Sequence, residues 1–165
     1  MATLAPDECQ ATTDAPPAVD EASADAKLAA IPRPLILFDG DCGFCNKSIQ
    51  YILKRDKAKQ FHFAALESEV GKAALRQAGL PKDYKKSLVL LDDAGTHVKS
   101  TGVARIAARL DGISKAGSWV RIIPRPLRDF GYDLVARYRY LLAGNGNVAT
   151  TCSLLPDEDR KRFVF

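Results

Sequence analysis

Two cysteines, Cys42 and Cys45, are separated by two residues and follow closely on the apolar run LILF at residues 35–38. Cysteines at this spacing can form a redox-active dithiol, provide two ligands for a soft metal ion, or simply fill a hydrophobic core. The elements that hold the pair decide between these chemistries, and the surrounding sequence predicts those elements.

The pair lies where a strand is predicted to give way to a helix. Residues 33–39 are short and apolar, which predicts a buried strand, and a helix is expected to start near Cys42. The first turn of a helix offers unpaired N–H groups and the positive end of the dipole, and both stabilise a thiolate. Cys45 shares a helical face with Ile49 and Ile52 and is expected to point inward. We therefore expect an exposed, attacking Cys42 and a shielded, resolving Cys45.

Two carboxylates, Asp39 and Asp41, flank the cysteines. Asp39 ends the predicted strand, where it could take the proton of Cys45 as a general base during resolution. Aspartate is also a favoured helix N-cap, so either side chain could bind the first N–H groups of the helix. We assign Asp41 mainly to capping and leave Asp39 open between proton transfer and a structural role.

Metal binding is the alternative chemistry, because two thiolates suit Cu(I) or Zn²⁺. A four-ligand zinc site would need further ligands from Cys9, His62, His97 or Cys152. The sequence contains no second CxxC and no HxxxH motif that would supply them. Cys152 stays open between a third redox thiol and a small buried hydrophobic residue.

The predicted elements alternate between strands and helices along the chain. After the first strand and helix, the pattern predicts a strand at 61–66, a helix at 67–79, a hairpin at 87–100, a helix at 102–112, and helical segments on both sides of Pro124 and Pro126. This order is β-α-β-α-β-β-α with further helix. It predicts an α/β fold of thioredoxin layout, with three layers, a central mixed sheet flanked by helices, and extra C-terminal helices.

One domain is predicted, at residues 31–165, preceded by an acidic tail at residues 1–30. The tail lacks large apolar residues that could offset the entropy of ordering, so we expect it to be disordered. It also lacks the features of a secretory signal or an Arg-rich transit peptide, and no apolar run reaches the roughly 18 residues of a membrane span. A cytoplasmic location without membrane contact is therefore expected.

The predicted domain is basic, because residues 31–165 hold 23 Lys and Arg against 14 Asp and Glu, a net charge of about +9. Arginines and tyrosines interleave in residues 121–140, a pattern that can bind nucleic acid strands. We favour instead a final helix pair that packs on the sheet and keeps its arginines in solvent, with no nucleic acid partner. Its packing residues are predicted to be Phe130, Leu134, Val135 and Tyr138.

The segment FDGDCGFC carries the motif D-x-x-C-x-x-C at Asp39, Cys42 and Cys45. It resembles the signature of the DCC family of thiol–disulfide oxidoreductases. The ending, with YDLVARYRYLLAG, Cys152 and RKRF, is similar to that family's ending, so the resemblance spans residues 34–165. It implies a thioredoxin-like fold and redox activity at the two cysteines, with Asp39 as the third signature residue.

One feature of thioredoxins is absent. Thioredoxins place a cis-proline opposite the cysteine pair, just before the hairpin, where it shapes the groove for the substrate backbone and helps to exclude metals. The corresponding positions here are Lys86 and Ser87. Substrate recognition of the thioredoxin kind is therefore in doubt, and the metal alternative stays open.

These observations together predict a thiol–disulfide oxidoreductase of the protein-disulfide reductase type, acting through Cys42 and Cys45 with Asp39. No bound cofactor is required, because the cysteine pair itself carries two electrons. The expected partners are a disulfide-containing protein or a small thiol as substrate, and a reducing partner that resets the pair.

Overall fold

The structure is a computed structural model that describes residues 21–144 and 155–164. Its described strands form one sheet in the order β2-β1-β3-β4. β1 pairs parallel with β2 and antiparallel with β3, and β3 forms an antiparallel hairpin with β4. The strands are β1 Leu35–Phe38, β2 His62–Ala65, β3 Val89–Asp92 and β4 Gly95–Val98. This mixed sheet confirms the predicted α/β, thioredoxin-like fold.

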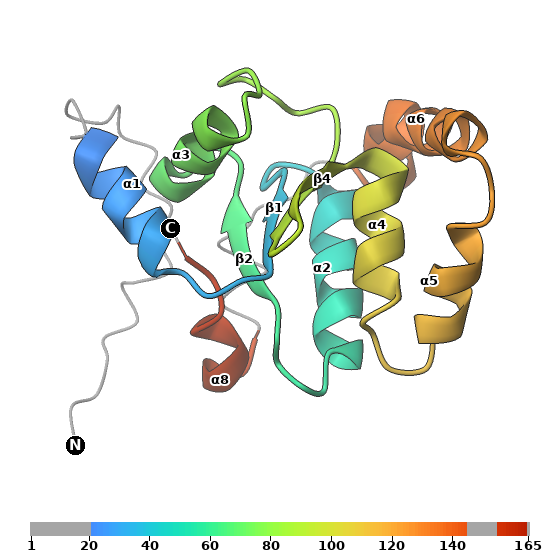
Figure 1. Ribbon diagram of the computed structural model, residues 1–165, viewed down its shortest axis with the longest axis horizontal. Coiled ribbons are helices and arrows are strands. Elements are labelled where there is room, and N and C mark those ends of the chain that lie inside the picture. Colours follow the sequence, from blue (N-terminus) through green and yellow to red (C-terminus); the bar gives the residue numbers. More distant parts are fainter. Residues whose placement is uncertain (1–20, 145–154, 165) are drawn as a thin grey trace.

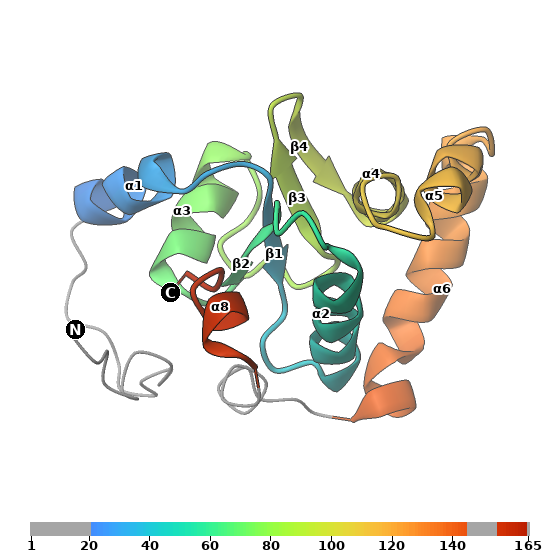
Figure 2. The ribbon, with the colours of Figure 1, turned by 90° about the horizontal axis from the view of Figure 1, so that it is seen from below.

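Helices cover both faces of the sheet, which gives three layers (Figures 1 and 2). α1 and α3 lie on one face, and α2 and α4 lie on the other. α5 packs on α4, and α6 contacts both α4 and α2, so this last pair forms an outer layer. The helices are α1 Glu21–Ala30, α2 Gly43–Arg55, α3 Glu69–Gln77, α4 Lys99–Ala107, α5 Ser114–Val120, α6 Arg125–Ala143 and α8 Asp157–Arg160.

The alternation of side chains along β1 divides the core into two parts. Leu35 and Leu37 point to the side of α1 and α3, whereas Ile36 and Phe38 point to the side of α2 and α4. All four side chains are fully buried. A strand covered on both faces needs a continuous apolar run, and the LILF sequence supplies it.

The predicted tail ends earlier than residue 30. Residues 21–30 form α1, whose Leu28 is fully buried in the core beside α3. Arg76 of α3 also binds Asp25 of α1 at 2.9 Å. The apolar Ala24 and Leu28 lie one helical turn apart. Two apolar residues in an acidic segment were too few to predict a packed helix from the sequence. Residues 1–20 lie outside the described part of the chain.

The predicted break near Pro124 and Pro126 is confirmed, since α5 ends before these residues and α6 begins at Arg125. The predicted packing of the final helix is wrong. Phe130 and Leu134 are exposed, Phe130 by 70%, while Arg139 is buried with only 7% exposed. The cause is the layer order, because α2 and α4 already cover that face of the sheet and α6 packs on them through its other side.

None of the described helices is both long and apolar enough to cross a membrane.

A buried ion pair fastens the C-terminal segment to the rest of the domain. Arg162 pairs with Asp56, which ends α2, and its Nε donates to the Phe61 carbonyl at 2.9 Å. Asp56 also accepts from the Phe61 N–H at 3.0 Å. The neighbouring Phe163 stacks on Phe63 of β2 with ring centroids 5.2 Å apart. Arg162 and Phe163 are therefore part of the core, whereas the neighbouring Lys161 stays exposed.

Arg162→Met should cost about 3–5 kcal/mol of unfolding free energy, because it leaves the buried Asp56 carboxylate without its cation. Urea unfolding followed by circular dichroism measures the change. Lys27→Gln, which removes an exposed ion pair with Glu69, is the matched control and should cost at most about 1 kcal/mol. Equal losses in the two variants would contradict the structural role given to Arg162.

Candidate active site

The cysteine pair lies at the junction predicted for it, between β1 and α2. β1 ends at Phe38, α2 begins at Gly43, and Cys42 is the N-cap residue of the helix. The Cys42 Sγ accepts a hydrogen bond from the Cys45 N–H, with 3.4 Å between the two atoms. Both cysteines are free thiols. A sulfur in this position is held by a helix N–H group and faces the positive end of the helix dipole.

The predicted order of exposure is wrong. Cys42 is fully buried, with 0% exposed, and Cys45 is the partly exposed sulfur. The C-terminal end of α6 lies close to Cys42, because the Gly43 N–H donates to the Gly144 carbonyl at 3.1 Å. Cys45 faces the side of α4 and α6, where it lines a cavity. Helical periodicity correctly predicted which face of α2 carries Cys45, but it could not predict that this face borders a cavity.

The Cys45 thiol is difficult to ionise in this environment. Burial, followed by the hydrogen bond to Cys42, raises the pKa of the Cys45 thiol to about 12. The charges of Cys42 and Asp39 act in the same direction, while the guanidinium of Arg139 lowers this pKa. Cys45 therefore keeps its proton at neutral pH and offers it to the Cys42 sulfur.

Asp39 is buried and forms an ion pair with Arg139 of α6. Its Oδ2 lies 3.0 Å from Arg139 Nη2, and its Oδ1 accepts from the Asp41 N–H at 3.1 Å. Arg139 also donates to the Lys85 carbonyl, just before β3. The N-cap position of α2 is occupied by Cys42 and not by Asp39. Its carboxylate is close enough to influence Cys45, which keeps the proton-transfer role open.

Asp41 does not cap the helix either, since Cys42 occupies the N-cap position. Asp41 is exposed and pairs with Lys85 at 3.2 Å, and the same ammonium group lies 2.9 Å from Glu67. Hydrogen bonding to Glu67 is the main reason that the pKa of Lys85 is raised. Oxygen atoms of Asp39, Asp41 and Glu67 lie within 4.8 Å of one another, and Lys85 supplies a positive charge to this acidic group.

Of the residues considered as extra metal ligands, His62 and His97 form no cluster with the cysteine pair in the described part of the chain. In residues 21–144 and 155–164, that acidic group is the one compact set of three possible ligands, and it contains no sulfur. His97 binds Asp92 at 3.0 Å in the hairpin, and His62 lies in β2. Cys9 and Cys152 fall outside the described residues.

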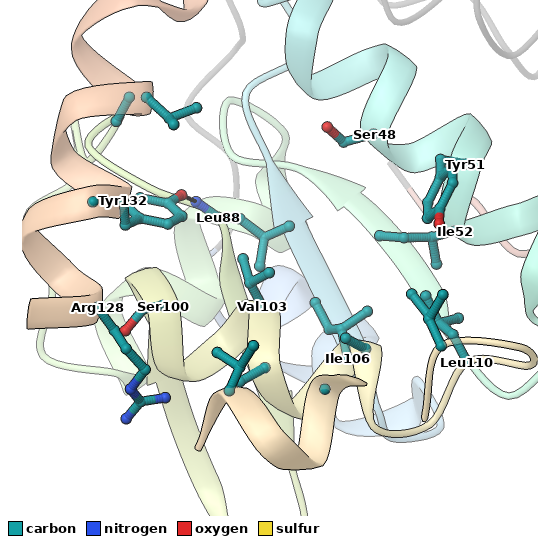
Figure 3. A pocket seen from close by; sticks show the side chains of 18 of the residues that line it. Ser48, Tyr51, Ile52, Leu88, Ser100, Val103, Ile106, Leu110, Arg128 and Tyr132 are labelled. Atoms are coloured by element: carbon teal, nitrogen blue, oxygen red, sulfur yellow. Dashed lines mark hydrogen bonds between the residues drawn. The ribbon is translucent and has the colours of Figure 1, made fainter. Parts of the chain in front are cut away.

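A half-open cavity of about 920 Å³ borders the site and is lined mainly by α2, α4, α5 and α6. Figure 3 shows Tyr51 and Ile52 on its α2 side, Val103 and Ile106 on α4, and Tyr132 on α6. Cys45 and Arg139 belong to its lining, so the cavity reaches the active-site sulfur.

Sequence reasoning missed Arg139, Lys85 and this cavity. Arg139 lies 100 residues after Asp39, and no local pattern connects the two. One signal was present, because Tyr132, Ala136 and Arg139 recur at helical spacing and form a mixed polar face of α6. We took the apolar face of α6 as the buried one, and the polar face is the one that meets the site.

The comparisons with known proteins agree with this geometry. Residues 36–145 match the family model of the DCC1-like thiol-disulfide oxidoreductases. The chain is 35% identical to the uncharacterized protein YuxK of Bacillus subtilis, over 81% of this chain and 96% of that protein. It is 33% identical to the chloroplastic DCC family protein At1g52590 of Arabidopsis thaliana, over 70% of this chain and 67% of that one. No solved structure matches at a significant level. The chain belongs to the DCC1-like thiol-disulfide oxidoreductase family.

Proposed function

We propose that the protein reduces disulfides by thiol–disulfide exchange, with Cys42 as the attacking sulfur and Cys45 as the resolving one. The observation that carries this assignment is the position of the Cys42 sulfur at the N-cap of α2, beside a Cys45 thiol whose pKa is raised. Cys42 Sγ accepts the Cys45 N–H at the start of α2, whereas the pKa of Cys45 is raised to about 12. The sulfur that ionises more easily is the nucleophile.

The exchange proceeds in two steps whose electrons balance. The Cys42 thiolate attacks one sulfur of the substrate disulfide, and the other substrate sulfur leaves as a thiolate that takes up a proton. Cys45 then loses its proton and attacks Cys42, which releases the second substrate thiol. The substrate has gained two electrons and two protons, and the protein holds a Cys42–Cys45 disulfide. A reducing partner, either a dithiol protein or a small thiol, restores the dithiol.

The second step needs a base, because Cys45 keeps its proton at neutral pH. We assign this role to Asp39, a buried carboxylate whose charge acts on Cys45. Arg139 positions that carboxylate through the 3.0 Å ion pair and lowers the pKa of Cys45. Arg139 is therefore a positioning residue in the proposed mechanism.

Access to the attacking sulfur involves α6. Cys42 has no exposed surface, and the bond between the Gly43 N–H and the Gly144 carbonyl lies over the start of α2. We infer that this end of α6 moves aside when a disulfide approaches. A reducing compartment suits a protein that must be reset by thiols, and the cytoplasm is our proposed location.

Exchange should be lost in Cys42→Ser, because the nucleophile is gone. Cys45→Ser should instead accumulate a mixed disulfide at Cys42, because no thiol remains to release the substrate. Intact-mass spectrometry after mixing with a disulfide-bonded peptide measures both outcomes, with the unchanged protein as the control. A mixed disulfide formed at Cys45 in the Cys42→Ser variant would reverse the assignment.

Asp39→Asn should slow resolution by about 100-fold and the attack step much less, since a positioned general base contributes about that factor or more to the step it serves. Rapid acid quenching separates the two steps by mass. Asp41→Asn is the matched control, because this neighbouring carboxylate is exposed and pairs with Lys85. Equal slowing of both steps in Asp39→Asn would assign Asp39 a structural role.

The reduced protein should lose stability as pH rises from about 9 toward about 12. The raised pKa of Cys45 means that the folded state keeps a proton that the unfolded state releases in this range, so unfolding is favoured by rising pH. Urea unfolding at a series of pH values from 8 to about 10.5, early in that range, measures the slope. Cys45→Ala should have a shallower slope. The same slope in both proteins would show that Cys45 ionises as easily when folded as when unfolded.

A further inference from the structure

The cavity beside Cys45 has walls suited to an apolar molecule. About 920 Å³ is within the range of small-molecule sites and is large for a packing defect. Side chains from four helices line it, and most of them are apolar. In Figure 3, Val103 and Ile106 of α4 lie between the α2 side and the α6 side. The members used below are Tyr51, Ile52, Val103, Ile106 and Val120.

One charged group in the lining has no partner. Nε and Nη1 of Arg128 are shielded from solvent, and neither makes a hydrogen bond within the described part of the chain. The adjacent carboxylate, Asp129, is taken by Ser100 and by Arg125 at 3.5 Å. Asp133 on the next turn pairs with Lys99 at 2.8 Å. Two shielded guanidinium nitrogens without an acceptor are unfavourable, so a ligand that brings a negatively charged acceptor would relieve this cost.

We propose that this cavity is a binding site for a single-chain anionic amphiphile, with its acyl chain along the walls formed by α2, α4 and α5 and its carboxylate or phosphate group on Arg128. A neutral apolar molecule would fill the walls but leave Arg128 unpaired. A small anion would pair with Arg128 but leave the apolar walls empty. The site borders Cys45, yet binding requires no reaction at either sulfur, so the inference does not rest on the proposed exchange activity.

Binding of decanoate to the reduced full-length protein, measured by isothermal titration calorimetry below the micelle concentration, tests the site. We expect saturable binding at one molecule per chain, with 1-decanol binding more weakly. Arg128→Gln should weaken decanoate binding about tenfold and leave decanol binding unchanged, because it removes one charged hydrogen-bonding partner. Arg121→Gln, an exposed arginine of the same helical pair outside the lining, is the matched control and should bind as the unchanged protein does.

A second variant tests the cavity itself. Val103→Trp fills the space between α2 and α6, and Val103 is 44% exposed, so the fold should tolerate the larger side chain. It should abolish decanoate binding, whereas Phe130→Ser on the exposed face of α6 should not change it. Absence of saturable binding, equal affinity for decanol and decanoate, or binding that Phe130→Ser removes and Val103→Trp spares would each overturn the proposal.

The same chemistry exists in free acyl anions and in anionic membrane lipids, and sedimentation with phosphatidylglycerol vesicles separates the two sources. Sedimentation abolished by both Val103→Trp and Arg128→Gln would support a lipid as the occupant of the cavity. No sedimentation, together with decanoate binding, would support a free acyl anion. Sedimentation that neither variant reduces would overturn the cavity as a lipid site.

Discussion

The ion pair between Asp39 and Arg139 is the constraint on which the active site depends. It joins the loop that carries the cysteines to a helix 100 residues later, and both side chains are almost completely buried. Removing one member of such a pair leaves a buried charge without compensation, so the stability of the cysteine loop and the position of α6 depend on each other. Through this pair, α6 holds the Asp39 carboxylate in place near Cys45. The charge of Arg139 also lowers the pKa of Cys45 directly.

Side chains of α6 also form hydrogen bonds with the backbone of the segment that precedes β3. Arg139 donates to the Lys85 carbonyl, and the Tyr132 hydroxyl accepts from the Leu88 N–H at 3.1 Å. Thioredoxins have their cis-proline in this segment, where it shapes the groove for the substrate backbone. Here the segment has Lys86 and Ser87 and its polar groups are already paired with α6. At Lys85 and Leu88 this backbone edge is therefore already occupied by α6.

Sequence reasoning succeeded where a local pattern determines the outcome. The apolar LILF run, the strand-to-helix junction at Cys42 and the break at Pro124 all depend on neighbours within a few residues, and the mixed sheet was expected from the order of strands and helices. It failed where the burial of a residue depends on which helices pack first on the sheet. Periodicity shows that α6 has an apolar face and a polar face, but not that α2 and α4 occupy the sheet before it. The burial of Arg139 and the covering of Cys42 both follow from that order of layers.

This layer order also separates the surroundings of the two sulfurs. Cys42 lies beneath the end of α6, where a helix N–H group and the dipole favour its thiolate. Cys45 faces the cavity between α2 and α6, where apolar surroundings keep it protonated. The position of α6 thus contributes to the apolar surroundings of Cys45, and the same helix ends over the start of α2, beside the buried Cys42. Reactivity and access are opposed in this arrangement, so the mobility of the α6 end relative to α2 is expected to set the rate at which the thiolate meets its substrate.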